Sequence, residues 1–89
     1  MTIEERREIY KEAIEKNGSE GQVIVCIEEL SELTKELTKF LRGKGDIERI
    51  ADEIADVRIT VEQMVMIFEC ASDVASHMDL KVRRLEARL

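Results

Sequence analysis

The chain of 89 residues contains no proline, no tryptophan and only three aromatic residues, which are Tyr10, Phe40 and Phe68. β-Sandwiches and β-barrels depend on aromatic residues and on many turn residues, and this composition, with only four glycines, lacks both. The residues that are abundant, chiefly Glu, Leu, Lys, Arg and Ile, are those that favour long helices. We therefore predict an all-α fold.

Long apolar runs and an excess of positive charge are also missing. No stretch approaches the roughly 18 apolar residues that a membrane-spanning helix needs, so we expect no membrane partner. The 14 Lys and Arg residues against 20 Asp and Glu residues give a net charge of −6, which argues against a nucleic-acid polymer as partner. A hydrophobic content of 44% excludes a disordered chain. We predict one domain spanning residues 1–89.

The chain has two cysteines, Cys26 and Cys70, and neither has a neighbouring cysteine or histidine at the spacing of a zinc site. Both lie in apolar helical stretches, so we expect buried free thiols. No charged-then-apolar leader opens the sequence. These features together predict a protein of the reducing cytoplasm.

Hydrophobic periodicity predicts four helices, the first two of which are separated by a short stop. The first spans residues 2–16 and is ended by Asn17-Gly18. Ser19, followed three residues later by Gln22, has the pattern of a capping box that begins the second helix. We expect this second helix to end at about Arg42.

The Gly43-Lys44-Gly45 segment is the strongest break in the chain. Asp46 is placed to cap a third helix that runs to about Phe68. We expect Ser72 to cap a last helix that continues to the C-terminus, although no glycine or proline marks this final break.

The second and third predicted helices carry apolar residues on more than one side. Each has an apolar stripe at helical spacing and further apolar residues away from it. An 89-residue chain has too few helices to cover two sides of both. We therefore expect a homodimer or homotetramer, a four-helix-bundle type of assembly built around these two helices. The residues away from the stripes are Ile24, Val25, Ile59, Met66 and Ile67.

Two pairs of acidic residues flank the central turn. Glu29 and Glu32 lie one turn apart on the second helix, and Glu53 and Asp56 repeat this spacing on the third. In an antiparallel hairpin centred on Lys44, the two pairs come level to within about one turn. We expect the four carboxylates to converge on one partly buried point.

Four converging carboxylates repel one another unless a cation lies between them. A hard divalent cation with oxygen ligands is the natural solution, so the pattern predicts a site for Mg²⁺, with Mn²⁺ as an alternative. The competing interpretation is that the acids are exposed and form ion pairs. Their possible partners would be Lys35, Arg49 and Arg58.

The segment Glu28-Glu29-Leu30-Ser31-Glu32 and, 20 residues later, Glu53-Ile54-Ala55-Asp56 resemble the EExxE and ExxD motifs of the MazG-like nucleotide pyrophosphohydrolases. The resemblance runs from about Gln22 to the end of the chain and implies the fold of the all-α NTP pyrophosphatase superfamily, to which these enzymes belong. It implies hydrolysis of a nucleoside triphosphate between the α and β phosphates, which yields the monophosphate and pyrophosphate. It also implies that the magnesium ligands are Glu29, Glu32, Glu53 and Asp56. Glu28 would either orient the catalytic water or face solvent.

Positive charge is concentrated in the last predicted helix. Lys81, Arg84 and Arg88 resemble the basic terminal helix of the same family, which implies that they bind the outer phosphates of the substrate. The alternative is that these cations stabilise the C-terminal end of a helix dipole. His77, the only histidine, has no acidic partner at a catalytic spacing and is expected at the surface.

Two functions of other classes compete with hydrolysis. One is a non-enzymatic helical dimerisation module, or a regulatory module that binds nucleotide without cleaving it. The other is a small dimeric helical enzyme of the chorismate mutase type, which would need Arg and Lys converging on an apolar pocket. The convergent charges in this sequence are acidic, so we favour the pyrophosphohydrolase.

Overall fold

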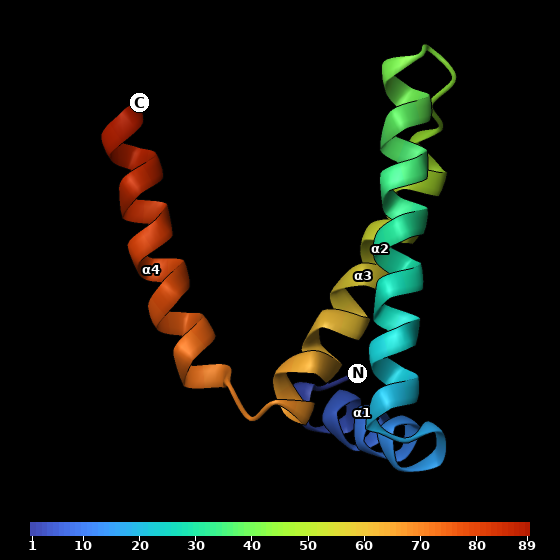
Figure 1. Ribbon diagram of the computed structural model, residues 1–89, viewed down its shortest axis with the longest axis vertical. Helices are drawn as coiled ribbons and strands as arrows, with labels where there is room; N and C mark the ends of the chain where they lie inside the picture. Colours follow the sequence, from blue (N-terminus) through green and yellow to red (C-terminus); the bar gives the residue numbers. More distant parts are fainter.

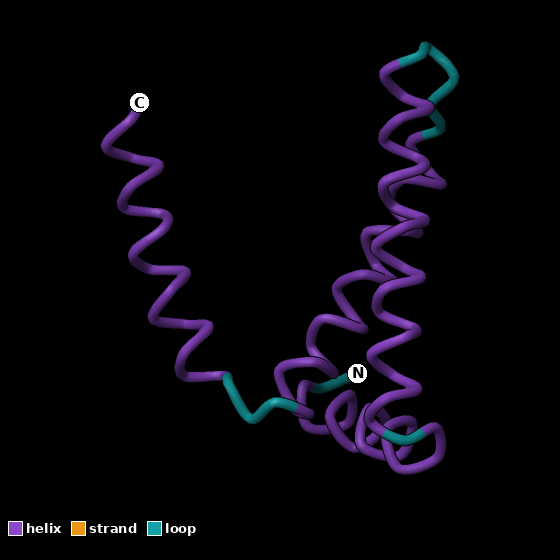
Figure 2. Tube along the Cα trace, viewed as in Figure 1, coloured by secondary structure: helices purple, strands orange, loops and turns teal.

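A computed structural model describes residues 1–89 and contains four helices and no strand (Figure 2). The all-α prediction is confirmed, and the helix ends lie within two residues of those expected. No helix combines the length and the apolar character needed to span a bilayer. The helices are α1 (Ile3–Asn17), α2 (Ser19–Leu41), α3 (Ile47–Ile67) and α4 (Ala71–Arg88).

The capping box lies at the start of α1 and not at the start of α2. The Glu5 amide donates to Thr2 Oγ1 at 3.1 Å, and the Thr2 amide donates to Glu5 Oε1 at 3.4 Å. The box expected from Ser19 and Gln22 was wrong, because Ser19 is already the first residue of α2 and Gly18 precedes it without a side-chain cap. The Gln22 side chain is used elsewhere.

The side chain of Gln22 links three helices instead of capping one. It is buried, its Nε2 donates to Gln63 Oε1 on α3 at 2.5 Å, and its Oε1 accepts from Asn17 Nδ2 at the end of α1 at 2.6 Å. Buried amides need such partners, because an unpaired polar group away from water is destabilising. This chain of hydrogen bonds fixes α1 against the α2–α3 pair.

The turn between α2 and α3 has the geometry expected of its glycines. Gly43 adopts φ +75°, and its amide donates to the Phe40 carbonyl at 3.0 Å while the Lys44 amide donates to Lys39 at 2.9 Å. This is a Schellman motif, whose left-handed residue favours glycine. Gly45 is needed for space, because a Cβ there would lie 2.8 Å from Phe40 Cα.

The third helix begins as predicted and runs back along the second. The Asp46 side chain accepts a hydrogen bond from the Glu48 amide at 2.9 Å and so caps α3. The α2–α3 pair is the largest helix–helix contact in the chain, and α1 packs across one end of it (Figure 1).

The link from α3 to α4 repeats the Schellman geometry without glycine. Glu69 adopts φ +50°, its amide donates to Met66 at 3.3 Å and the Cys70 amide donates to Val65 at 3.2 Å. The expectation that Ser72 caps α4 was wrong, because Cys70 takes the cap position and makes no side-chain hydrogen bond. The backbone reverses direction at Glu69, so α3 ends at Ile67 and α4 begins at Ala71.

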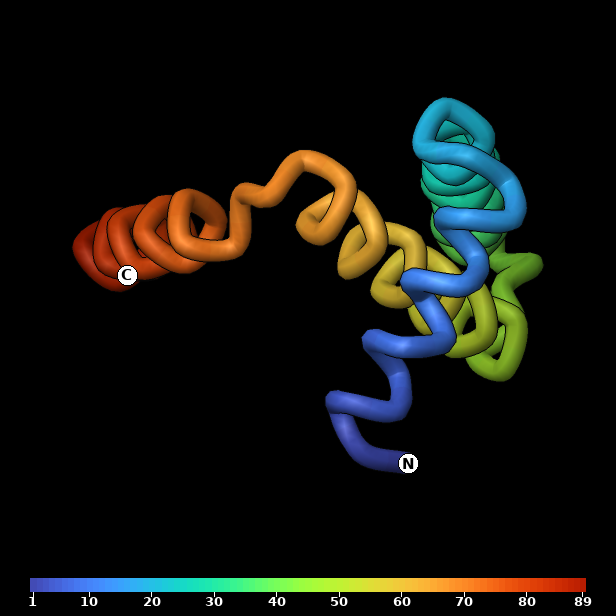
Figure 3. The backbone as a smooth tube through the Cα atoms, turned by 90° about the horizontal axis from the view of Figure 1, so that it is seen from below, coloured from blue at the N-terminus to red at the C-terminus, as the bar shows by residue number.

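The fourth helix stands apart from the rest of the chain. It contacts only α3, near the link, and then extends away from α1, α2 and α3 (Figures 1 and 3). The radius of gyration is 15.4 Å. A compact domain of this length has a radius of gyration of about 12 Å.

The core of the single chain is small. Only six of 89 residues are buried, and the accessible surface is 7323 Å². A folded monomer of this mass exposes about 5,400 Å², so the chain leaves an excess of about 2,000 Å² uncovered. Many large apolar residues are exposed, among them Ile27 of the α2 stripe and, away from the stripes, Ile24 on α2 and Ile59 on α3. The six buried residues are Tyr10, Gln22, Cys26, Glu36, Thr60 and Gln63.

Candidate metal centre

The structure brings three of the predicted acidic residues together. Glu29 on α2 and Glu53 and Asp56 on α3 each place one carboxylate oxygen within 4.8 Å of the others, and all three side chains are half-buried. We call these three residues the acidic cluster. Their i, i+3 spacing on α3 turns Glu53 and Asp56 toward the same side of that helix, where α2 packs.

The separation of these oxygens is suitable for one divalent ion. Oxygen ligands lie about 2.0–2.1 Å from Mg²⁺ and about 2.3–2.6 Å from Ca²⁺, so two ligands of one ion are separated by up to about 4–5 Å. No lysine or arginine forms an ion pair with the cluster. Arg49, one of the partners considered from sequence, pairs instead with Asp46 at 3.9 Å.

One oxygen of the cluster has no hydrogen-bond partner. Oε2 of Glu53 is buried and is the one side-chain oxygen or nitrogen of this kind in the chain. Removal from solvent raises the pKa of the Glu53 carboxyl, and the negative charges of Asp56 and Asp52 raise it further. A buried oxygen without a donor is destabilising, and a bound cation would satisfy it.

The Glu29 carboxyl has the most strongly shifted titration. Its pKa is raised to about 6, first by removal from solvent, then by a hydrogen bond with Asp56, and then by the charges of Asp56, Glu53 and Glu32. Two carboxyl groups form such a hydrogen bond only if one of them keeps its proton. Above about pH 6 the cluster loses this proton and its negative charges face one another without compensation.

The other acidic residues of the EExxE motif lie outside the cluster. Glu32 is exposed one turn further along α2, yet its charge contributes to the raised pKa of both Glu29 and Glu53. Glu28 is exposed on α2 beside Glu29. Glu32 therefore lies close enough to act on the cluster, whereas Glu28 is adjacent to Glu29 only in sequence.

The predicted phosphate-binding residues are not near the cluster within one chain. Lys81 and Arg84 are exposed on α4, and α4 makes no contact with α2 (Figure 1). His77 is exposed on the same helix, as the sequence indicated.

Sequence reasoning missed one acidic residue of this region. Glu36 on α2 is only 6% exposed and forms an ion pair with Lys39 Nζ at 3.2 Å. Its charge is one of those that raise the pKa of Glu53. The spacing of Glu29, Glu32 and Glu36, which is three and then four residues, places all three on one face of a helix and would have identified it.

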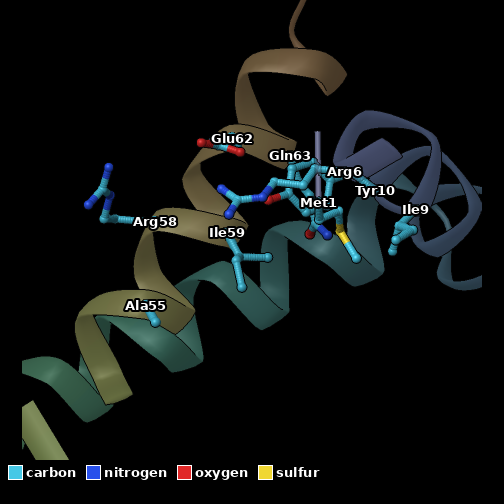
Figure 4. A pocket seen from close by; sticks show the side chains of 9 residues that line it. All are labelled: Met1, Arg6, Ile9, Tyr10, Ala55, Arg58, Ile59, Glu62 and Gln63. Atoms are coloured by element: carbon cyan, nitrogen blue, oxygen red, sulfur yellow. The ribbon is translucent and has the colours of Figure 1, made fainter. Parts of the chain in front are cut away.

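A separate cleft lies between α1 and α3 (Figure 4). It is lined by apolar side chains together with Tyr10, Arg6 and Arg58, and it reaches α3 at Ala55. Burial raises the pKa of the Tyr10 hydroxyl, and the neighbouring Glu62 raises it further. None of the cluster residues lines this cleft, so the apolar and the acidic sites are distinct surfaces of α3.

Comparison of the chain with protein-family models, with characterised proteins and with solved structures finds no match. Functional assignment therefore depends on the two acidic motifs and on the geometry of the cluster that they form.

Proposed function

We propose that this chain is a magnesium-dependent nucleoside triphosphate pyrophosphohydrolase. The observation that carries the proposal is the acidic cluster, in which carboxylates from α2 and α3 meet without a lysine or arginine partner. Glu29, Glu53 and Asp56 would hold the ion, with Glu32 as a further ligand from the solvent side. The resemblance of the two motifs to those of MazG-like enzymes supplies the type of reaction.

The orphaned Glu53 oxygen and the composition of the cluster fit Mg²⁺ or Mn²⁺, both of which prefer carboxylate oxygens. The bound ion supplies neutralisation of the triphosphate charge and stabilisation of the pyrophosphate leaving group. Glu29 and Asp56 must lose their shared proton before both can act as ligands. Binding of the ion would displace this proton, so we expect metal affinity to rise with pH up to the pKa of Glu29.

The chain's own residues would position and deprotonate the attacking water. The water oxygen forms a bond to the α phosphorus as the bond to the oxygen that bridges the α and β phosphates breaks. Pyrophosphate departs, and the water proton passes to a carboxylate of the site. We assign orientation of this water to Glu28, the exposed residue that precedes Glu29 in the EExxE motif.

We also propose that the active form is a homodimer or homotetramer built around α2 and α3. The excess exposed surface of about 2,000 Å² per chain is within the range that each partner of an obligate dimer buries. The phosphate contacts expected of Lys81 and Arg84 stay predictions, since α4 does not reach α2 in one chain. Cys26 and Cys70 are free thiols, although only Cys26 is buried as expected and Cys70 is half-buried. Free thiols fit the reducing cytoplasm that we propose as the compartment.

Pyrophosphate release from a panel of NTPs and dNTPs tests the activity. We expect release with Mg²⁺ or Mn²⁺, none with EDTA, and a loss of at least about 100-fold in Glu53→Gln and Glu32→Gln if these carboxylates hold the ion. Glu48→Gln is the matched control, because Glu48 is an exposed acid in the first turn of the same helix. Folded protein that turns over no member of the panel with magnesium present would overturn the proposal and favour the nucleotide-binding or dimerisation module.

A further inference from the structure

The α4 helix is the part of the chain that most needs a partner. Every residue of α4 is exposed, and the helix contacts nothing beyond the end of α3. A helix of 18 residues is only marginally stable alone in water. Four of its large apolar side chains, Met78, Val82, Leu85 and Leu80, are more than half exposed.

The apolar residues of α4 repeat with the period of a coiled coil. Five of them, continued by Leu89 just after the helix, are separated alternately by four and three residues, which is the spacing of positions a and d in a heptad, while Val74 and Ala87 lie off this series. Val82 takes an a position and Leu85 a d position, a combination that favours two-stranded parallel coils. Leu80 lies on the opposite side of the helix. The members of this seam are Ala71, Ala75, Met78, Val82, Leu85 and Leu89.

The charges beside this seam distinguish a parallel from an antiparallel pair. In the heptad frame, Lys81 occupies a g position, and Asp79 and Glu86 occupy e positions. A parallel pair places Lys81 opposite Glu86 of the second copy, twice by symmetry. An antiparallel pair would place Lys81 against Lys81 and Asp79 against Asp79.

Within one chain the two residues of this predicted ion pair are free. Neither Lys81 nor Glu86 forms an ion pair, whereas Asp79 is already bound to Arg83 Nε at 3.1 Å. The charge pattern is therefore complementary to a second copy of the same helix in parallel orientation.

We infer that α4 pairs with α4 of a second copy of this chain as a parallel two-stranded coiled coil. The seam is closed by the a and d residues and bordered by two ion pairs between Lys81 and Glu86. This inference does not depend on the proposed enzymatic activity. It gives Lys81 a role at the interface and leaves Arg84, which lies on the outer side of the helix, available to solvent or to phosphate.

Disulfide trapping in the full chain tests the pairing directly. In a parallel coil two Val82 residues face each other with their Cα atoms about 6 Å apart, a distance that a disulfide can bridge. We expect oxidised Val82→Cys protein to run as a covalent dimer. Arg83→Cys is the matched control, because the next residue along the helix points away from the seam, and wild-type protein controls for Cys26 and Cys70.

Equal trapping of Val82→Cys and Arg83→Cys would overturn the inference. Efficient trapping of the double variant Met78→Cys with Val82→Cys, without trapping of Val82→Cys alone, would show an antiparallel pair and would also overturn it. If α4 instead packs on α2 or α3 of another copy, neither disulfide between α4 helices will form. That result would also overturn the inference.

A charge exchange tests the assigned register. In the Val82→Cys background, Lys81→Glu and Glu86→Lys each create two like-charge contacts. We expect each substitution to weaken association about five- to tenfold, measured as a lower fraction of disulfide-linked dimer at equilibrium. The double variant Lys81→Glu with Glu86→Lys restores opposite charges and should recover the original value. A double variant as weak as the single variants would contradict the register.

Discussion

The α2–α3 hairpin and the α4 helix are incomplete in opposite ways. The hairpin packs extensively but gathers Glu29, Glu53 and Asp56 without a compensating positive charge. In α4 the charged side chains are exposed to solvent, but the apolar seam is exposed as well. Clustered carboxylates attract a cation, whereas an apolar seam attracts another protein surface. The hairpin therefore presents a surface suited to a cation, and α4 presents a surface suited to another helix.

The largest expected effect is the stabilisation of the folded protein by a metal ion, which should depend on the α2–α3 hairpin and not on α4. Mg²⁺ or Mn²⁺ at 100 times its dissociation constant should stabilise the folded protein by about 2.7 kcal/mol. For a domain of this size that is a rise in Tm of roughly 10 °C or more. Glu53→Gln should abolish the rise, whereas Arg84→Ala on α4 should leave it unchanged. A metal-dependent rise of equal size in both variants would contradict a site in the hairpin.

The second largest effect concerns the turn that holds the hairpin together. Gly45→Ala places a Cβ 2.8 Å from Phe40 Cα, and backbone atoms cannot move aside as a flexible side chain would. We expect a loss of roughly 1–3 kcal/mol in the free energy of unfolding, measured by chemical denaturation.

Gly21→Ala is the control for this substitution. Gly21 lies within α2, where a Cβ would meet only Asn17 Cβ at an ordinary 3.5 Å. Alanine there should stabilise the protein by up to about 1 kcal/mol. Equal loss in both variants would show that the close approach at Gly45 is unimportant.

A smaller effect should appear in the pH dependence of the metal-free protein. The folded state holds the Glu29 proton more tightly than the unfolded chain, with a pKa of about 6 against 4.5. Protonation of Glu29 therefore favours folding. This contribution is present below pH 4.5 and is lost as the pH rises through 6. After allowance for solvent screening we expect Glu29→Gln to stabilise the metal-free protein at pH 7.5 by up to about 1 kcal/mol.

Thermal unfolding of wild-type and Glu29→Gln protein at pH 4.5 and pH 7.5 measures this difference. The gain in the variant should be smaller at pH 4.5, where Glu29 is protonated. A gain of the same size at both values would mean that the repulsion within the cluster does not act through Glu29.

The smallest effect compares the two helix ends. Gly43 and Glu69 make the same backbone hydrogen bonds at positive φ, but a residue with a side chain is strained there. Glu69→Gly should therefore raise the free energy of unfolding by about 0.5 kcal/mol, and Gly43→Ala should lower it by a similar amount. Loss of stability in Glu69→Gly together with a gain in Gly43→Ala would show that side chains are not strained at these two positions.

The helices and the central hairpin were predictable because their signals are local. Periodic apolar residues, Gly43 and Gly45, and the cap at Asp46 each act within a few residues. The Ser19 cap failed because Gln22 forms its hydrogen bonds with Asn17 and with distant Gln63. The break after α3 was the hardest to predict, because the residue that reverses the backbone is Glu69, and no sequence pattern marks a glutamate at positive φ.

The candidate site was predictable only in part. The spacing on each side of Lys44 indicated that carboxylates from two helices would meet, and Glu29, Glu53 and Asp56 do so. Which acid would remain at the solvent side depends on the rotation of α2 against α3, and this is a property of packing that the spacing does not determine. The position of α4 was not predictable, because within the chain it contacts only α3 and no packing of its apolar residues fixes its direction.

A crystal structure of the full chain soaked in Mn²⁺, with anomalous scattering measured at the manganese edge, tests the central claim most directly. We predict a peak between α2 and α3 within ligand distance of Glu29, Glu53 and Asp56. A cluster without manganese, with its carboxylates bound instead to lysine or arginine side chains of a neighbouring copy, would contradict the account.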